Sequence, residues 1–340
     1  DFCLSRGLGD VYKRQELFKT QKFYQIDISI LKDLGYDVLL SNRIFDSLLF
    51  WKYDILFSYF YRYSFFAALL AKCFGKKTYF TGGIDSLDSD YASAFNYKIQ
   101  ALFFKLCYWV ADSCIIVSQS DLKNIFKVSS LKKKLSYSEH VINTKLFIAD
   151  VPKEKIFTSI VWMGDEGNVV RKGVDKALQI FAELKKIPEF VDYRFVIIGR
   201  KGEGEVLVRS IIDKYNLKGS VELKGEVSEE DKINLLKQSK YYFQLSLYEG
   251  FGLAALEALC ANNIIIHSGK GGLANPIYKE QLLFDIDNDF DSELLKLVNK
   301  LACFTPITSY DNLLEYYDIQ RRKDDFEAII VNGKSNYKLK

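Results

Sequence analysis

The chain has 340 residues, more than one hydrophobic core usually supports, so two domains are expected. Hydrophobic residues make up 49% of the sequence and charged residues 27%, which is typical of a globular protein. The net charge of +3 argues against the strongly basic surface of a nucleic-acid-binding protein, and six cysteines without C-x-x-C spacing argue against a zinc site.

Residues 1–15 do not share the pattern of the sequence that follows them. The run LSRGLGDVYKRQ resembles translated adapter sequence, and the chain does not open with a buried strand and a glycine loop. We therefore expect residues 1–15 to be a non-native scar and the first strand of the first domain to be missing.

Helices and strands alternate through the first domain, which is expected to span residues 16–147. Alternation of this kind predicts a parallel, doubly wound sheet. The expected helices are 16–34, 63–74, 95–111 and 118–127, and the expected strands are 36–41, 54–59, 77–81 and 114–117.

Two glycines and an aspartate follow the expected strand 77–81. Gly82, Gly83 and Asp85 should lie at the carboxyl edge of the sheet, where α/β folds bind ligands, so they are candidates for contact with an acceptor or a donor sugar. A plain turn is the alternative, because glycine and aspartate are turn residues.

A second alternating series follows a charged stretch, 148–156, which we expect to link the two domains. This series predicts a second doubly wound domain over residues 157–318. The expected strands are 157–163, 193–198, 221–223, 241–247 and 264–268, the expected helices are 174–186, 205–215, 229–239, 253–261, 292–302 and 310–317, and residues 165–170 are expected to form a loop.

The most informative stretch is 241–272, which reads as strand, loop, helix, strand and glycine loop. Glu249 lies in the first loop, and Glu257 lies about one and a half turns into the following helix. The free N–H groups and the dipole at that helix start favour an anion. Carboxylates beside an anion site suit a ligand that combines a diphosphate, a diol and a hydroxylated ring, as a nucleotide sugar does.

The motif E-G-F-G-L-A-A-L-E, residues 249–257, resembles the E-x7-E signature of family-four glycosyltransferases. The later Gly271-Gly272 pair and the outline of H-V-I-N-T-K-L-F, residues 140–147, also resemble that family. The resemblance implies the GT-B fold, with two Rossmann-like domains facing each other across a cleft. It also implies that a final helix, 319–332, crosses back to the first domain ahead of a frayed tail, 333–340.

The resemblance further implies a retaining transfer of a hexose from a UDP- or GDP-sugar to a glycan or lipid-linked acceptor. Glu249 would orient the sugar and stabilise the reacting centre, Lys172 in R-K-G-V-D would neutralise the diphosphate, and Glu257 would hold the ribose. Basic side chains and a helix dipole replace a metal in such enzymes, so no cofactor is expected. The remaining candidate donor contacts are Arg171, Gly250, Phe251, Gly252, Leu253, Gly164 and Gly199.

Several alternatives stay open at this point. Asp165 stands where the family usually has an arginine, which Arg171 would have to replace, and Lys172 would otherwise be an exposed basic residue. A non-catalytic subunit that binds a nucleotide sugar, a nucleotide-sugar epimerase and a phosphorylase are the rival functions. A cytoplasmic location is expected, with peripheral contact at the inner face of the plasma membrane as an option. The side chains that would either face a membrane or pack internally are Phe65, Phe66, Phe103, Phe104, Lys98 and Lys105.

Overall fold

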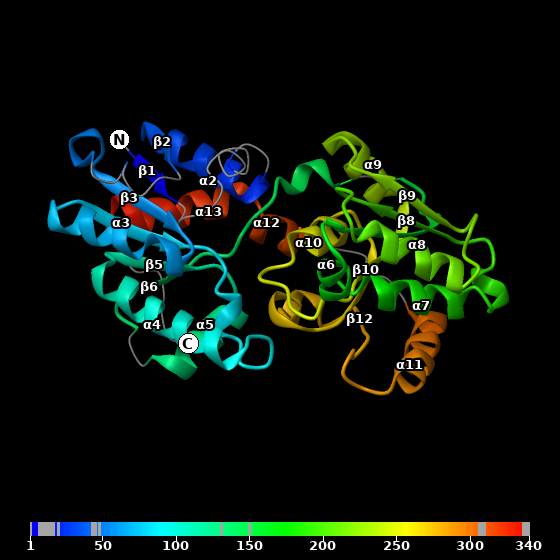
Figure 1. Ribbon diagram of the computed structural model, residues 1–340. Coiled ribbons are helices and arrows are strands. Elements are labelled where there is room, and N and C mark those ends of the chain that lie inside the picture. Colours follow the sequence, from blue (N-terminus) through cyan, green and yellow to red (C-terminus); the bar gives the residue numbers. More distant parts are fainter. Residues whose placement is uncertain are drawn as a thin grey trace. The chain divides into compact units, whose positions relative to one another are not determined.

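The computed structural model describes residues 2–5, 18, 21–41, 46, 49–129, 132–148, 151–304 and 311–334. The chain divides into two compact units, each built on a six-stranded parallel sheet (Figure 1). Unit 1 comprises Asp1–Ile142 and Tyr316–Lys340, and unit 2 comprises Asn143–Glu315. The prediction of two doubly wound α/β units is therefore confirmed.

Unit 1 has the strand order β2-β1-β3-β4-β5-β6. Its strands are β1 (Phe2–Ser5), β2 (Val38–Ser41), β3 (Ile55–Tyr59), β4 (Lys77–Thr81), β5 (Ser113–Ile116) and β6 (Leu135–Tyr137). Its helices are α2 (Lys22–Asp33), α3 (Tyr61–Cys73), α4 (Ala94–Val110), α5 (Gln119–Val128) and α13 (Ile319–Phe326), the last followed by a π-helical turn at Glu327–Val331. Of these strands, β1 and β6 are absent from the sequence prediction.

Strand β1 corrects one expectation about the start of the chain. Residues Phe2–Ser5 pair in parallel with both β2 and β3. They therefore occupy the position of the first strand, which was predicted to be missing. Four residues are enough to complete a ladder when partners with free backbone groups lie on both sides. Residues 6–15, which carry most of the adapter-like sequence, lie outside the described residues.

The C-terminal helix α13 belongs to the core of unit 1. Arg322 is fully buried, and its Nε and Nη2 donate to the Asp27 carboxylate on α2 at 2.6 and 2.9 Å. Its Nη1 donates to the Ser138 carbonyl oxygen at 2.6 Å, and the Tyr59 hydroxyl donates to Asp27 at 2.7 Å. The guanidinium thus ties the end of the chain to α2 and to the segment after β6.

Unit 2 has the strand order β12-β11-β10-β7-β8-β9. Its strands are β7 (Glu154–Ile160), β8 (Arg194–Ile198), β9 (Val221–Gly225), β10 (Ser239–Gln244), β11 (Ile264–His267) and β12 (Leu282–Leu283). The helices that follow β7 are α6 (Glu166–Arg171), α7 (Val174–Leu184), α8 (Glu205–Lys214), α9 (Glu229–Gln238), α10 (Leu253–Cys260), α11 (Phe290–Cys303) and α12 (Asp311–Tyr316).

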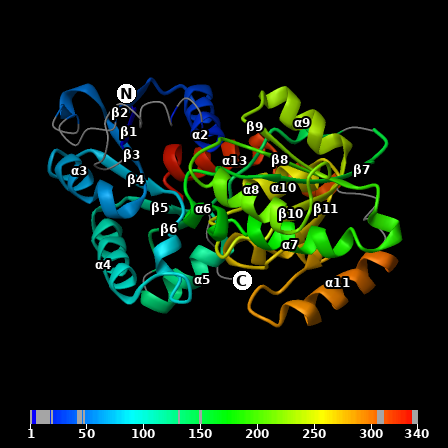
Figure 2. The same ribbon diagram turned by 45° about the vertical axis from the view of Figure 1, so that its right-hand side comes forward.

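Helices cover both faces of the unit 2 sheet, since its strands carry apolar side chains on both faces. In β8, Phe195 and Ile197 join the core under α7, α8 and α11, whereas Val196 and Ile198 pack with Leu235 of α9. Figure 2 lets the reader follow these helices around the sheet. Continuous apolar strands of this kind are typical of parallel sheets with helices on both faces.

Among the differences from the sequence prediction in unit 2, two concern the segments before and after β7. Strand β7 begins at Glu154, inside the predicted linker 148–156. Helix α6 replaces the predicted loop at 165–170, because the Asp165 side chain caps it by accepting a hydrogen bond from the Asn168 N–H at 2.7 Å.

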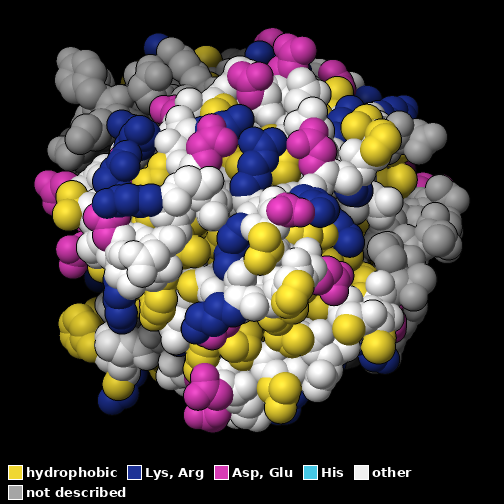
Figure 3. Space-filling model, turned by 90° about the vertical axis from the view of Figure 1, so that its right-hand side faces the viewer, with side chains coloured by type: hydrophobic (Ala, Val, Ile, Leu, Met, Phe, Trp, Pro, Cys, Tyr) yellow, Lys and Arg dark blue, Asp and Glu magenta, His cyan; other side chains and the backbone are white. Residues whose placement is uncertain are grey.

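The surface carries both signs of charge. Figure 3 shows one face of the molecule, on which Lys and Arg side chains are interspersed with Asp and Glu, as the small net charge suggests. Among the residues that the structure describes, none of the helices combines the length and the apolar character needed to cross a bilayer.

Candidate functional site

The candidate site lies where the chain order of the unit 2 sheet reverses. From the centre of the sheet, β7, β8 and β9 succeed one another toward one edge, and β10, β11 and β12 succeed one another toward the other edge. Strands β7 and β10 pair directly at the centre. Doubly wound sheets bind ligands at the carboxyl ends of the two strands at such a point. The segments that leave β7 and β10 carry Lys172 and Glu249, respectively.

Lys172 and Glu249 form an ion pair although they are 77 positions apart in the sequence. The Lys172 Nζ lies 2.7 Å from Oε2 and 2.9 Å from Oε1 of Glu249. The two side chains are only 20% and 15% exposed, so water and salt screen this attraction less than at an open surface. The structure therefore brings together the two residues predicted to be catalytic.

The backbone around Lys172 is fitted closely to the end of β10. Gly173, between α6 and α7, has a φ of 68°, and a Cβ there would lie 2.0 Å from the Leu245 carbonyl oxygen. Only glycine permits this conformation and this approach together. The Leu247 N–H donates to the Arg171 carbonyl oxygen at 2.8 Å, which joins the two loops directly.

Two polar side chains of the β10 end hold Glu249 in addition to Lys172. Gln244 Nε2 and Ser246 Oγ donate to Glu249 Oε2 at 3.2 and 3.0 Å. Sequence analysis missed both residues, although polar residues at alternate positions of an apolar strand point to the same side. That alternation was the available signal.

The loop that bears Glu249 is also held by the second glycine loop. The Gly272 N–H donates to the Glu249 carbonyl oxygen at 2.5 Å. Gly252, in the left-handed conformation, is the N-cap of α10, and Tyr278 donates its hydroxyl to the Gly252 carbonyl oxygen at 3.4 Å. The predicted Gly271-Gly272 pair thus supports the Glu249 loop through its backbone.

Glu257 lies on α10 and pairs with a lysine that sequence analysis did not identify. The residue is 5% exposed, and Lys232 Nζ on α9 lies 2.6 Å from its Oε2. Lys232 also lies 3.0 Å from Glu229. A contact between two different helices leaves no local spacing signal in the sequence. Each of the two carboxylates of the predicted motif, Glu249 and Glu257, is therefore paired with a lysine.

The other predicted donor residues of unit 2 lie at α6, beside β7 and β8, and at the start of α10. The Arg171 guanidinium donates to Asn168 Oδ1 at 2.6 Å, within α6. Gly164 directly precedes Asp165, the cap of that helix. A Cβ at Gly199, whose φ is 131°, would lie 2.0 Å from the Val161 carbonyl oxygen, so this glycine has a packing role between β7 and β8. Gly250, Phe251 and Leu253 flank Gly252 at the start of α10.

The predicted residues of unit 1 lie at the carboxyl end of β4. Gly82 has a φ of 103°, and Asp85 begins a short 3-10 helix, Asp85–Leu87. A Cβ at Gly83 would lie 3.1 Å from Asp85 Oδ1. These residues belong to a different unit from Glu249, and their predicted contact with a sugar stays a prediction.

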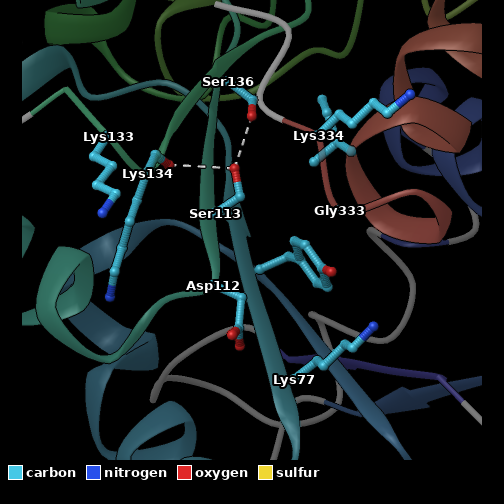
Figure 4. A pocket seen from close by; sticks show the side chains of 10 residues that line it. Lys77, Asp112, Ser113, Lys133, Lys134, Ser136, Gly333 and Lys334 are labelled. Carbon is cyan, nitrogen blue, oxygen red and sulfur yellow. Dashed lines mark hydrogen bonds between the residues drawn. The ribbon is translucent and has the colours of Figure 1, made fainter.

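Unit 1 also contains a pocket that the sequence did not predict, at the opposite edge of its sheet (Figure 4). Its volume is about 240 Å³, and its lining includes Lys77, Lys133, Lys134 and Lys334. The Lys134 ammonium donates to the Trp109 carbonyl oxygen at 2.9 Å, and in Figure 4 Lys77 and Lys334 lie away from Lys133 and Lys134. The pocket therefore does not present converging cations to one anion. Within the described ranges, no group of three or more His, Cys, Asp or Glu side chains is placed to hold a metal ion.

Solved structures resemble the whole chain in fold. The crystal structure of HepE from Anabaena in complex with UDP superposes with a TM-score of 0.71 and covers 98% of this chain and 100% of that one, at 11% identity. Sucrose-phosphate synthase from Thermosynechococcus elongatus superposes with a TM-score of 0.66, covering 98% of this chain and 96% of that one at 16% identity. The chain has the GT-B fold. The predicted fold class is thereby confirmed.

The part of this GT-B chain that carries the candidate site also matches a family model. Residues 167–301 match the model described as "Glycosyl transferases group 1". This segment contains Lys172, Glu249 and Glu257.

Curated relatives also match part of the chain. A GDP-mannose:cellobiosyl-diphosphopolyprenol alpha-mannosyltransferase from Xanthomonas oryzae is 32% identical over 163 residues, covering 42% of this chain and 40% of the relative. One subunit of the human phosphatidylinositol N-acetylglucosaminyltransferase is 30% identical over 105 residues, covering 31% of this chain and 21% of the relative. The chain thus spans less than half the length of these relatives. These matches support the prediction that the chain is a glycosyltransferase.

His267 makes the stability of unit 2 sensitive to acid. It ends β11, is 5% exposed, and its ring centroid lies 5.6 Å from that of Tyr278. Burial lowers the pKa of His267 from 6.5 to about 4. Between these values the unfolded chain binds a proton that the folded chain excludes, so stability falls as the pH falls.

We expect the free energy of unfolding to drop by about 2 kcal/mol between about pH 7.5 and about pH 5 through His267 alone. Urea unfolding of the protein and of His267→Leu at both pH values measures the contribution of His267 to this pH dependence. The substitution should reduce the pH dependence by that amount. Equal pH dependence in the two proteins would contradict the assignment.

Proposed function

We propose that the protein is a family-four glycosyltransferase that transfers a hexose, with retention of configuration, from a nucleoside diphosphate sugar to a glycan or lipid-linked acceptor. The observation that carries the proposal is the ion pair of Lys172 and Glu249 at the switch point, beside the start of α10. A cation, a carboxylate and a helix N-terminus are the groups that an activated sugar with a diphosphate requires.

The residues divide the chemistry among them. The bond between the anomeric carbon and the diphosphate oxygen breaks, and negative charge grows on the leaving diphosphate. Lys172 and the α10 N-terminus stabilise that charge, Glu249 orients the sugar, and Glu257 accepts hydrogen bonds from the ribose hydroxyls. The acceptor oxygen attacks from the same face, and the departing diphosphate takes its proton. No metal ion or other cofactor takes part in this scheme.

The comparisons suggest classes of donor and acceptor. The Xanthomonas relative is named for GDP-mannose, and Anabaena HepE was solved with UDP, which supports a UDP- or GDP-hexose as donor. The same Xanthomonas name includes a diphosphopolyprenol, and the human relative is named for phosphatidylinositol. A lipid-linked acceptor, met at the inner face of the plasma membrane by a cytoplasmic enzyme, fits these names.

Turnover separates this proposal from a non-catalytic subunit that only binds the donor. The purified chain, incubated with a panel of UDP- and GDP-hexoses, is expected to release the nucleoside diphosphate from one of them, slowly by hydrolysis and faster with acceptor. Binding of a nucleotide sugar without any release would support the non-catalytic alternative instead.

Glu257→Ala is expected to weaken nucleotide binding by about 1–3 kcal/mol, because the ribose loses a charged hydrogen-bond acceptor. Calorimetry with UDP and GDP measures the change. Glu293→Ala is the matched control, since Glu293 on α11 is similarly buried, with a side chain 6% exposed, and pairs with Lys296 at 2.6 Å. Unchanged affinity for both nucleotides in Glu257→Ala would count against the assigned role.

A further inference from the structure

Helix α4 presents an unusual outer face. Phe95, Leu102 and Trp109 are 71%, 55% and 69% exposed, and Lys98 and Lys105 are exposed between them. These positions follow one another at intervals of three and four residues, which places them on one side of a helix. We call these five residues the α4 outer face. At 1.5 Å per residue it is roughly 21 Å long.

The inner side of the same helix is packed in the core, which decides between the two alternatives that the sequence left open for some of these side chains. Phe104 is 0% exposed and Phe65 of α3 is 8% exposed, so neither is available to a membrane. Phe66 of α3, by contrast, is 56% exposed. Helices α3 and α4 pack side by side in Figures 1 and 2, and the Phe66 ring centroid lies 5.3 Å from that of Phe65.

The chemistry of the α4 outer face fits a lipid surface with negative charge. The 17 residues of α4 include two lysines and no aspartate or glutamate. Large apolar side chains that stay in water cost free energy, and Phe, Leu and Trp insert into the boundary between headgroups and acyl chains. Lysines beside them keep their stems on apolar surface while their ammonium groups reach anionic headgroups.

We propose that the α4 outer face docks unit 1 on an anionic bilayer, with Phe95, Leu102 and Trp109 inserted and Lys98 and Lys105 at the headgroups. The inference rests on the proposed function for its biological sense, because a lipid-linked acceptor must be met at a membrane. Vesicle binding itself needs no donor or acceptor. A failure of docking and a failure of glycosyl transfer are therefore distinguishable.

Flotation of the full chain with vesicles tests the docking. The protein is expected to float with phosphatidylcholine vesicles that contain phosphatidylglycerol and to stay in solution with phosphatidylcholine alone. The triple variant Phe95→Gln, Leu102→Gln, Trp109→Gln should lose flotation. Lys98→Gln with Lys105→Gln should weaken binding about fivefold per lysine at low salt. UDP and GDP binding should be unchanged in both variants.

The matched control replaces two equally exposed apolar residues of unit 2. Val206 on α8 and Leu295 on α11 are 70% and 64% exposed, and Val206→Gln with Leu295→Gln should leave flotation intact. Absence of flotation with anionic vesicles, or flotation that survives the triple variant, would overturn the proposal. So would a dimer in light scattering that the triple variant dissociates, because the face would then be an interface with a second copy.

Discussion

Lys172→Ala is expected to lower turnover of the nucleotide sugar by about 10²–10³-fold while unit 2 stays folded. The Lys172 ammonium is the cation that the structure holds beside the start of α10, and its side chain is 20% exposed. Charge that develops on a leaving diphosphate would lose this partner in a partly closed site, where water replaces it poorly. Steady-state release of the nucleoside diphosphate measures the loss.

A surface lysine provides the control for that experiment. Lys186 pairs with Glu183 at the same 2.7 Å distance as Lys172 pairs with Glu249, but its side chain is 70% exposed. Lys186→Ala should leave turnover unchanged, because an exposed pair is solvated in both states. If both variants turned over like the parent protein, Lys172 would have no part in the reaction. Circular dichroism of Lys172→Ala distinguishes lost chemistry from lost structure.

The protein's own side chains fix the orientation of Glu249. Its Oε2 accepts hydrogen bonds from Lys172, Gln244 and Ser246. A diphosphate entering beside Lys172 would share the lysine with Glu249. Such a preformed arrangement requires little reorganisation during the reaction, which is the condition under which fixed charges contribute most.

The local structure around Glu249 was predictable because glycine and asparagine mark its limits. The sequence predicts a helix over 253–261 and a strand over 264–268, and the structure has α10 at Leu253–Cys260 and β11 at Ile264–His267. Gly252 before the helix and Asn262 after it both adopt positive φ angles. Such positions are fixed by backbone sterics, which a single sequence reveals.

Sequence analysis missed one short helix and two contacts between distant segments. Helix α6 spans only Glu166–Arg171 and contains Gly167, so it has neither the length nor the periodicity that identifies a helix. Lys232 reaches Glu257 from another helix, and β1 becomes a strand because β2 and β3 lie on both sides of it. Tertiary packing decides the contact of Lys232 and the formation of β1, and residue propensities alone do not reveal it.

The largest stability effect is expected at the buried pair of Asp27 and Arg322. Their side chains are 1% and 0% exposed, with Nε 2.6 Å from Oδ1. Asp27→Ala would leave a buried guanidinium without its counter-charge, and we expect it to destabilise unit 1 by about 3–5 kcal/mol. Urea unfolding measures the loss, and limited proteolysis should then cleave near α13 sooner.

A double variant tests whether that loss comes from the unpaired charge. Asp27→Leu with Arg322→Met removes both charges and keeps apolar volume, so it should destabilise less than the sum of the two single variants. Its effect should not vanish, because the Tyr59 hydroxyl loses its acceptor and the Ser138 carbonyl its donor. Asp54→Ala is the control, since Asp54 pairs with Lys76 at 3.2 Å in the same unit with its side chain 80% exposed, and it should cost less than about 1 kcal/mol. Strictly additive losses in the double variant would show that Asp27 and Arg322 act independently.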